Sequence, residues 1–179
     1  KGFTTLFNYS ALGYKHYIVI VLRFAKPIYS NDFFKKHSDK NTLGIGMTLN
    51  KNDLWIELLF RNKEEFREYL NKFLNEQKDK IADYKILEPY IGKVYMLKFL
   101  GVEDKGSGIY FNPETKEVQL DKNELKIVKM LEKDGREKII DIANSLKISP
   151  ELAIYKIKRL YEKKVILSSA ALFDIEKLG

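Results

Sequence analysis

The chain has 179 residues, with 32 Lys and Arg against 25 Asp and Glu and a formal net charge of +7. It has no cysteine and two histidines, which excludes a disulfide framework, a thiolate metal site, a cysteine nucleophile and a histidine-rich metal centre. A hydrophobic content of 45% argues against intrinsic disorder, and no apolar run approaches the roughly 20 residues that span a bilayer. We therefore expect a cytoplasmic protein with one large or two small domains and no cofactor.

The first part of the chain alternates predicted strands and helices. The segment His16–Phe24 (HYIVIVLRF) is rich in β-branched and aromatic residues and predicts a strand. Further elements follow in order: a short helix at 30–36, strands at 42–49 and 54–60, a helix at 63–77 capped by Asn62, and strands at 84–87 and 94–100. The order βαββαβ is typical of a ferredoxin-like sandwich with both helices on one sheet face.

The strands of this part are apolar on both faces. In strand 16–24, one face carries Ile18, Ile20 and Leu22, and the other carries Tyr17, Val19 and Val21. Because the helices cover only one face, we expect the sheet of residues 14–100 to pack on another subunit in a homodimer or higher oligomer. The alternative is that the linker or the second domain covers this face.

The second part of the chain is helical, after a polar, turn-rich segment in which we place a domain boundary near Gly106. A hairpin is predicted at 109–120, followed by three helices. The first begins at Asp121 with Glu124 three residues on, the second covers 139–146, and the third runs from 150 to 163 after Ser149. Two short strands at 165–167 and 171–173 would form a wing. This order predicts a winged helix-turn-helix domain, so the whole chain is expected to be an α+β protein.

Periodicity assigns a buried stripe to the longer helices of this domain. We expect Leu125, Val128 and Leu131 to be buried in the first helix, and Ile154, Ile157 and Leu160 in the third. Residues off the stripe of the third helix are candidates for contacts to DNA bases or backbone, namely Ser149, Glu151, Leu152, Tyr155, Lys156, Lys158 and Arg159. For Leu152 and Tyr155, contact with a neighbouring element is an equally good interpretation.

Positive charge is concentrated around the same helix. Between residues 147 and 164, six cations stand against Glu151 and Glu162, which is a net +4 within 18 residues. A charge run on a helix is usually a solvated face, and a Lys-rich, Cys-free composition is also typical of heat-adapted surfaces. Its position after a helix-turn-helix nevertheless favours DNA, and we expect Lys156 and Arg159 to neutralise phosphates.

A set of motifs spans residues 120–179 without a gap. It comprises Asp121, Asp134-Gly135-Arg136, Ile142-Ala143, Ser149-Pro150, Lys158-Arg159-Leu160, Val165-Ile166 and Leu178-Gly179. The set closely resembles the DNA-binding domain of the Lrp/AsnC (feast/famine) transcriptional regulators. That family usually has glycine where this chain has Lys147 and Lys164. Either the turns differ, or the added charge offsets a backbone strain of about 1 kcal/mol.

The first part then resembles the other half of the same family, a ferredoxin-like ligand and assembly domain that dimerises through its sheets. Family members often bind an amino acid near a turn between the second and third strands. Here the turn is Asn50-Lys51-Asn52-Asp53, in which Asp53 matches the family and Lys51 reverses a charge. The resemblance implies a small-molecule effector, such as an amino acid, at Asn50, Asn52 and Asp53.

The domain order is the reverse of the family's. Residues 6–13 (LFNYSALG) match residues 172–179 (LFDIEKLG) at an offset of 166, about one family unit. We therefore expect a segment of a tandemly duplicated protein. In it, 1–13 would be a remnant of a wing and linker strand, 14–105 a ferredoxin-like domain, and 106–179 a winged helix-turn-helix domain.

These features predict a DNA-binding transcription regulator that dimerises through its ferredoxin-like domain and reads the major groove with helix 150–163. An alternative is a non-catalytic interaction module whose winged helix has lost DNA binding. A third is an enzyme, since sirohaem decarboxylases are similar to this family in fold and use His and Arg near a tetrapyrrole. His16 and His37 lie in no recognisable constellation, and no acid–base pair or nucleophile triad is visible, so we expect no catalytic activity.

Overall fold

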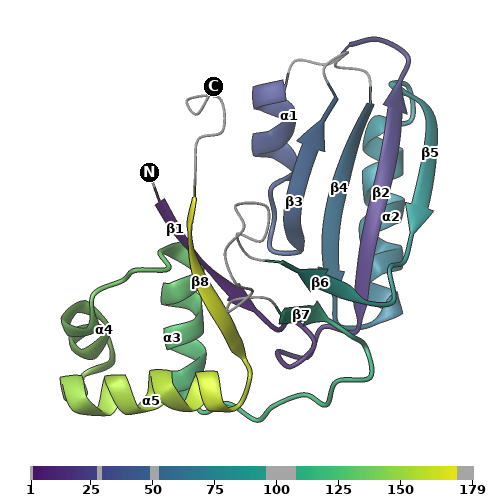
Figure 1. Ribbon diagram of the computed structural model, residues 1–179. Helices are drawn as coiled ribbons and strands as arrows, with labels where there is room; N and C mark the ends of the chain where they lie inside the picture. Colours follow the sequence, from purple (N-terminus) through teal and green to yellow (C-terminus); the bar gives the residue numbers. More distant parts are fainter. Residues whose placement is uncertain (1, 28–29, 49–52, 96–107, 173–179) are drawn as a thin grey trace. The chain divides into compact units, whose positions relative to one another are not determined.

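The computed structural model describes residues 2–27, 30–48, 53–95 and 108–172, and the chain divides into two compact units (Figure 1). Tyr14–Ile91 form one, here called the ferredoxin-like unit. Lys1–Gly13 and Gly92–Gly179 form the other, here called the winged-helix unit. The predicted boundary near Gly106 lies outside the described residues, and the structure moves the division upstream to residue 92. Among the described helices, none has the length and apolar character needed to cross a membrane.

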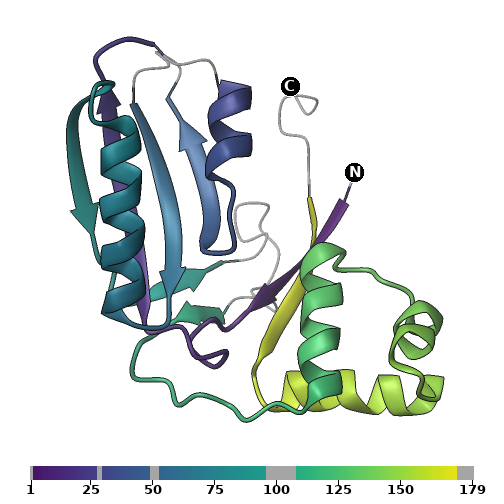
Figure 2. The same cartoon turned by 180° about the vertical axis from the view of Figure 1, so that it is seen from behind.

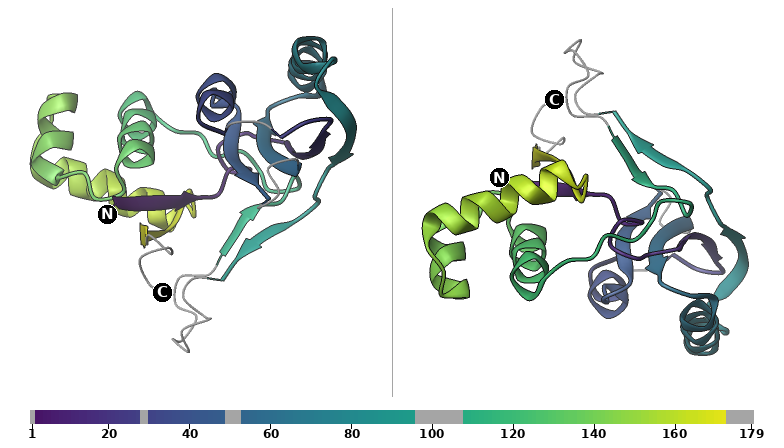
Figure 3. Two further views of the ribbon diagram at one scale, coloured as in Figure 1. Left: turned by 90° about the horizontal axis from the view of Figure 1, so that it is seen from above. Right: turned by 90° about the horizontal axis from the view of Figure 1, so that it is seen from below.

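The ferredoxin-like unit has the predicted βαββαβ order. Its elements are β2 (His16–Phe24), α1 (Ser30–His37), β3 (Thr42–Met47), β4 (Asp53–Phe60), α2 (Lys63–Gln77) and β5 (Ile81–Leu87). The strands form one antiparallel sheet in the order β3-β4-β2-β5. Both helices lie on the same face of this sheet (Figures 2 and 3). Helix α2 begins where its cap predicts, because the Asn62 side chain accepts the Glu65 N–H at 2.9 Å.

Strand β2 distributes its side chains between the two faces of the sheet. Its helix-facing residues Ile18, Ile20 and Leu22 are buried together with apolar residues of β4 and with Phe73 of α2. On the other face, Val21 lies opposite Trp55 of β4, and these side chains are 36% and 39% exposed. The open face therefore presents apolar surface at its centre, as the two-sided apolar pattern indicated.

The winged-helix unit combines elements from both ends of the chain. They are β1 (Gly2–Phe7), β6 (Gly92–Val94), β7 (Gly108–Phe111), α3 (Lys122–Lys133), α4 (Ile139–Leu146), α5 (Pro150–Glu162) and β8 (Ile166–Leu172). The three helices were predicted. The hairpin at 109–120 was wrong, because β7 pairs with β6 instead. The predicted strand at 94–100 overlaps β6 only at Val94, and residues 96–100 lie outside the described residues.

The predicted wing of two short strands is also corrected. Residues 166–172 form one continuous strand, β8, whose antiparallel partner is β1 at the start of the chain. Phe7 and Ala11 enter the core of the three helices with exposed fractions of 2% and 1%. The Gly135 N–H donates to the Phe3 carbonyl, which fixes the α3–α4 turn on β1. The first thirteen residues therefore complete the winged helix.

The buried stripes of α3 and α5 differ in part from the prediction. Val128 and Leu131 are buried as expected, but Leu125 is 45% exposed and the stripe continues through Ile127 and Glu124. In α5, Ala153 and Leu160 are fully buried while Ile154 is 41% exposed. The small side chain of Ala153 lies on the packed face together with Leu160, whereas Ile154 lies outside that face.

Candidate nucleic-acid interface

The helix-turn-helix is formed by α4, α5 and the short turn between them. Lys147 ends α4 in the left-handed conformation, with φ 56° and ψ 46°. Lys164, after α5, has φ 54°, and among the described residues these two lysines are the only non-glycine residues at positive φ. The turns therefore keep glycine-like geometry, at a cost of about 1 kcal/mol per lysine. Both lysines are exposed.

The first turn of α5 is set by local capping. The Ser149 hydroxyl accepts the Leu152 N–H at 3.2 Å, and Pro150 occupies the first helical position, as predicted. Glu151 follows in the same turn, where its own backbone N–H and the Ser149 hydroxyl lower the pKa of its carboxyl. The exposed start of α5 therefore carries a fixed negative charge.

Helix α3 begins with a complete capping box. Oδ1 of Asp121 accepts the N–H groups of Asn123 and Glu124, each at 2.9 Å. In return, Oε2 of Glu124 accepts the Asp121 N–H at 3.0 Å. This reciprocal pair satisfies the free donors at the helix start, which confirms the predicted cap.

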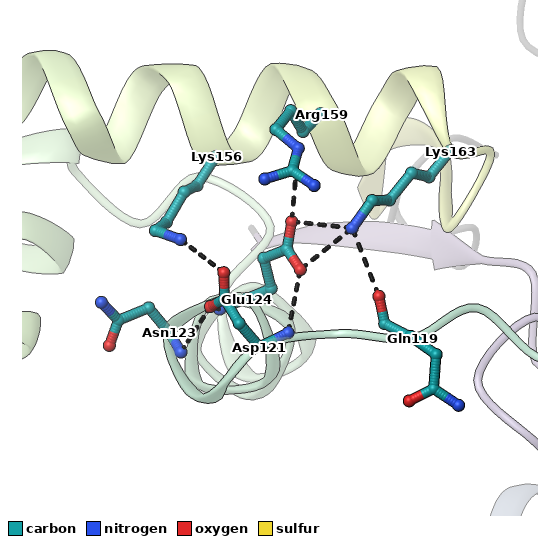
Figure 4. Close-up of polar contacts among 7 residues, drawn as sticks. All are labelled: Gln119, Asp121, Asn123, Glu124, Lys156, Arg159 and Lys163. Atoms are coloured by element: carbon teal, nitrogen blue, oxygen red, sulfur yellow. Dashed lines mark hydrogen bonds and ion pairs between the residues drawn. The ribbon is translucent and has the colours of Figure 1, made fainter.

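The same two carboxylates hold α5 against α3 (Figure 4). Nζ of Lys156 lies 2.6 Å from Oδ2 of Asp121. Nζ of Lys163, directly after α5, lies 3.0 Å from both carboxylate oxygens of Glu124, and Nε of Arg159 lies 3.8 Å from Oε1. The side chain of Glu124 is 1% exposed, so these contacts compensate a buried charge.

These contacts keep both acids ionised. The Lys156 ammonium, helped by the Glu124 N–H, lowers the pKa of Asp121. Burial alone would raise the pKa of Glu124, but the Asp121 N–H and the Lys163 ammonium together outweigh it and lower that pKa. A carboxyl whose pKa is lower in the folded state stabilises the fold above its unfolded pKa, and this stabilisation disappears as the pH falls through the folded value.

The contacts divide the predicted DNA-binding residues into two groups. Lys156, 12% exposed, and Arg159, 37% exposed, point toward α3. The remaining predicted residues are exposed on the outer side of α5 or its first turn, namely Ser149, Glu151, Leu152, Tyr155 and Lys158. Asp121 and Glu124 therefore hold three of the six cations, and Lys147, Lys158 and Lys164 remain exposed around α5.

The partners of Lys156 and Lys163 were not predicted, although the spacing of these residues in the sequence is informative. Lys156 in α5 and Lys163 directly after it are seven residues apart, while Asp121, which caps α3, and Glu124 in its first turn are three apart. Two acids at the start of one helix and two cations on one side of another are typical of an ion-paired contact between helices.

The predicted effector site falls partly outside the described residues. Asn50 and Asn52 lie outside the described residues, whereas Asp53 begins β4. The Asp53 carboxylate accepts a hydrogen bond from Nε of Arg23 at 3.0 Å, across the β2–β4 pair. This contact raises the pKa of the Arg23 guanidinium.

Both histidines are engaged within the ferredoxin-like unit. Nδ1 of His16 lies 2.7 Å from Oε1 of Glu88. His37 is buried between Phe33 and Phe73, and this burial lowers the pKa of its imidazole. The described part of the chain holds no group of three or more His, Asp or Glu side chains that could bind a metal ion.

Comparisons with known proteins agree with the geometry of the three helices. Residues 120–166 match the family model of winged helix-turn-helix DNA-binding domains. This part of the chain is a winged helix-turn-helix DNA-binding domain. Comparison of the sequence with curated proteins finds no match.

Two crystal structures resemble the chain in fold. One is the siroheme decarboxylase NirDL in co-complex with an iron-uroporphyrin III analogue, with a TM-score of 0.56 at 13% identity. The other is the siroheme decarboxylase NirDL, with a TM-score of 0.54 at 14% identity. Each match covers 96% of this chain and 50% of the other, so the chain spans half the length of those proteins. At such identities the likeness shows a shared fold.

Replacing Glu124 with glutamine should lower the free energy of unfolding of the winged-helix unit by about 2 kcal/mol, because Lys163 loses its ionised partner. Because glutamine does not titrate, the free energy of unfolding of the variant should also fall less than that of wild type between neutral and acidic pH. Trp55 lies in the ferredoxin-like unit, so its fluorescence does not report unfolding of the winged-helix unit. Hydrogen exchange of α3 and α5 measures that unfolding directly.

The matched control is Lys158→Ala, which removes an exposed cation from the same helix and should change stability by less than about 0.5 kcal/mol. Equal protection of α5 in Glu124→Gln and wild type across this pH range would show that the buried carboxylate does not hold the helix.

Proposed function

We propose that the chain is part of a transcription regulator that binds duplex DNA with α5 in the major groove. The observation that carries the proposal is the exposed side of the matched domain, where Lys147, Lys158 and Lys164 surround the outer face of α5. Lys147 and Lys164 lie at opposite ends of the helix, where phosphates flank a helix seated in the groove. Their strained backbone supports a role outside stability, since glycine would be favoured there on conformational grounds.

The residues on α5 then have separate roles. Lys147, Lys158 and Lys164 neutralise phosphates, and this makes binding depend on salt. Leu152 and Tyr155 offer apolar surface to thymine methyl groups, while the Glu151 carboxylate can accept from a cytosine amino group. Lys156, Arg159 and Lys163 act as positioning residues that fix the helix on α3.

A pairing register supports the proposed duplication. The offset of 166 between the matching segments equates Thr4 with Ala170, and these two residues lie opposite each other in the β1–β8 pair. A two-fold axis between them interchanges the observed pairs Gly2–Leu172 and Leu6–Ser168. Contacts between equivalent elements about a two-fold axis are typical of isologous interfaces. We infer that β1 and β8 are corresponding strands of two copies of one unit and that the DNA site is an inverted repeat.

Assembly and regulation belong to the ferredoxin-like unit in this proposal. The exposed pair Val21 and Trp55 supports an oligomer that buries the open face of the sheet. A small-molecule effector such as an amino acid would bind at the turn before Asp53 and displace or recruit Arg23. We propose no catalytic activity for the chain.

One observation favours an interaction module as the second candidate. Leu152, Ile154 and Tyr155 are 40%, 41% and 56% exposed along α5, which is enough apolar surface to contact a protein. A protein partner would bind this face with little dependence on salt, so ionic strength separates the two candidates.

Replacing both Lys147 and Lys164 with glycine should stabilise the winged-helix unit by about 1 kcal/mol per site, because the strain at positive φ is relieved. The same variant should bind random-sequence duplex DNA more weakly, with the slope of log K against log salt reduced by about 2. Fluorescence anisotropy over a salt series measures this slope. Lys129→Ala, which removes an exposed lysine of α3, should leave it unchanged. A wild-type slope in the glycine variant, or DNA binding indifferent to salt, would contradict the proposed interface.

Replacing Trp55 with lysine should dissociate the face-to-face oligomer, because each contact would bury an unpaired ammonium. Sedimentation velocity at micromolar concentration measures the change, and circular dichroism checks the fold. Assembly that is unchanged by this substitution would place the oligomer contact elsewhere.

A further inference from the structure

Strand β5 is a long edge strand with exposed apolar side chains. It lies at the end of the sheet order β3-β4-β2-β5 and forms hydrogen bonds to β2 on one side (Figures 1 and 3). No other strand in the described ranges pairs with its outer edge. Tyr84, Ile86 and Leu87 are 43%, 39% and 51% exposed. Such an edge is a template for another strand unless the chain blocks it.

The hydrogen-bonding groups of β5 have a defined direction. The Tyr84 N–H donates to Oδ1 of Asp83 at 2.9 Å, so it points to the outer edge and away from β2. Because backbone groups alternate along a regular strand, the N–H group of Ile86 points the same way, whereas the register shift at Ala82 interrupts the alternation on the other side. The outer edge therefore offers the N–H groups of Tyr84 and Ile86 to another strand.

We propose that β5 pairs antiparallel with β5 of a second copy of the chain, about a two-fold axis at Tyr84, to form a continuous eight-stranded sheet. In a symmetric pair of β5 strands, each side chain must lie opposite a side chain on the same face of the joined sheet. Only registers centred on a residue meet this condition. Registers centred on Asp83 or Lys85 place like charges opposite each other. The register centred on Tyr84 places Asp83 opposite Lys85 of the second copy twice, so charge complementarity selects it.

The same register pairs the apolar residues of the strand. Ile86 and Leu87 lie opposite the Ile81–Ala82 end of the second copy's strand, where the register shift lies. The Tyr84 N–H exchanges the Asp83 carboxylate for a carbonyl of the second copy, which frees Asp83 for Lys85. Within one chain, Asp83 faces Arg23 of β2 and Lys85 faces Val21, so the neighbouring strand does not neutralise Lys85.

This edge contact is separate from DNA binding and from the open face that carries Trp55. Antiparallel strand addition uses backbone hydrogen bonds for affinity, and here the two charge pairs set the register. The occupant is therefore a second copy of this chain, whose own β5 supplies both complementary charges.

Charge reversal provides the test. Asp83→Lys creates two like-charged pairs in the homodimer, and so does Lys85→Asp, so each variant alone should dimerise at least tenfold more weakly than wild type. A one-to-one mixture of the two variants forms opposite-charged pairs only and should recover dimerisation. Sedimentation equilibrium of wild type, each variant and the mixture measures this, and the Trp55→Lys background removes the contribution of the open face.

The mixture controls for misfolding, because unfolded variants could not rescue each other. Recovery in the mixture supports the register centred on Tyr84. Wild-type association in both single variants, no recovery on mixing, or a wild-type chain that stays monomeric in the Trp55→Lys background would each overturn the proposal. DNA binding by the monomer would be unaffected by any of these results.

Discussion

The position of α5 depends on the contacts of one buried carboxylate, that of Glu124. It belongs to the buried stripe of α3, it completes the cap of that helix, and it receives Lys163 and Arg159 from the end of α5. An ionised group in this position is costly unless its partners stay in place. The carboxylate therefore fixes the orientation of α5, and with it the side chains that face outward.

These contacts reduce the number of cations near α5 that are free to contact DNA. Three of the six cations between residues 147 and 164 contact the carboxylates of Asp121 and Glu124 across the two helices. The three that remain exposed lie on the outer face of α5 and in the two turns that flank it. A smaller number of well-placed cations, two of them in strained turns, is a more specific argument for DNA than the net charge.

Local signals in the sequence were sufficient for much of this structure. The caps at Asn62, Asp121 and Ser149 were predicted because each depends on a side chain and a backbone N–H within one turn. The βαββαβ order and the three helices followed from hydrophobic periodicity. The left-handed conformation of Lys147 and Lys164 could be anticipated from the glycines of the resembled family.

Contacts between distant segments were not predictable in the same way. Strand β8 gains its partner from residues 2–7, and no local pattern indicates such a pairing, so the wing was assigned to a local hairpin. The packed face of α5 includes Ala153, whose small size permits close contact but gives a weak hydrophobic signal. Lys156 was assigned to DNA because its partner Asp121 lies 35 residues away.

The most direct test of this account is the reactivity of individual lysines toward mild acetylation, measured by mass spectrometry with and without duplex DNA. Lys156 and Lys163 should react slowly in both samples, because their ammonium groups are held by Asp121 and Glu124. Lys147, Lys158 and Lys164 should react readily in the free protein and become protected by DNA. Fast acetylation of Lys156 and Lys163 in the free protein, with protection by DNA, would contradict the division between positioning and DNA-contacting cations.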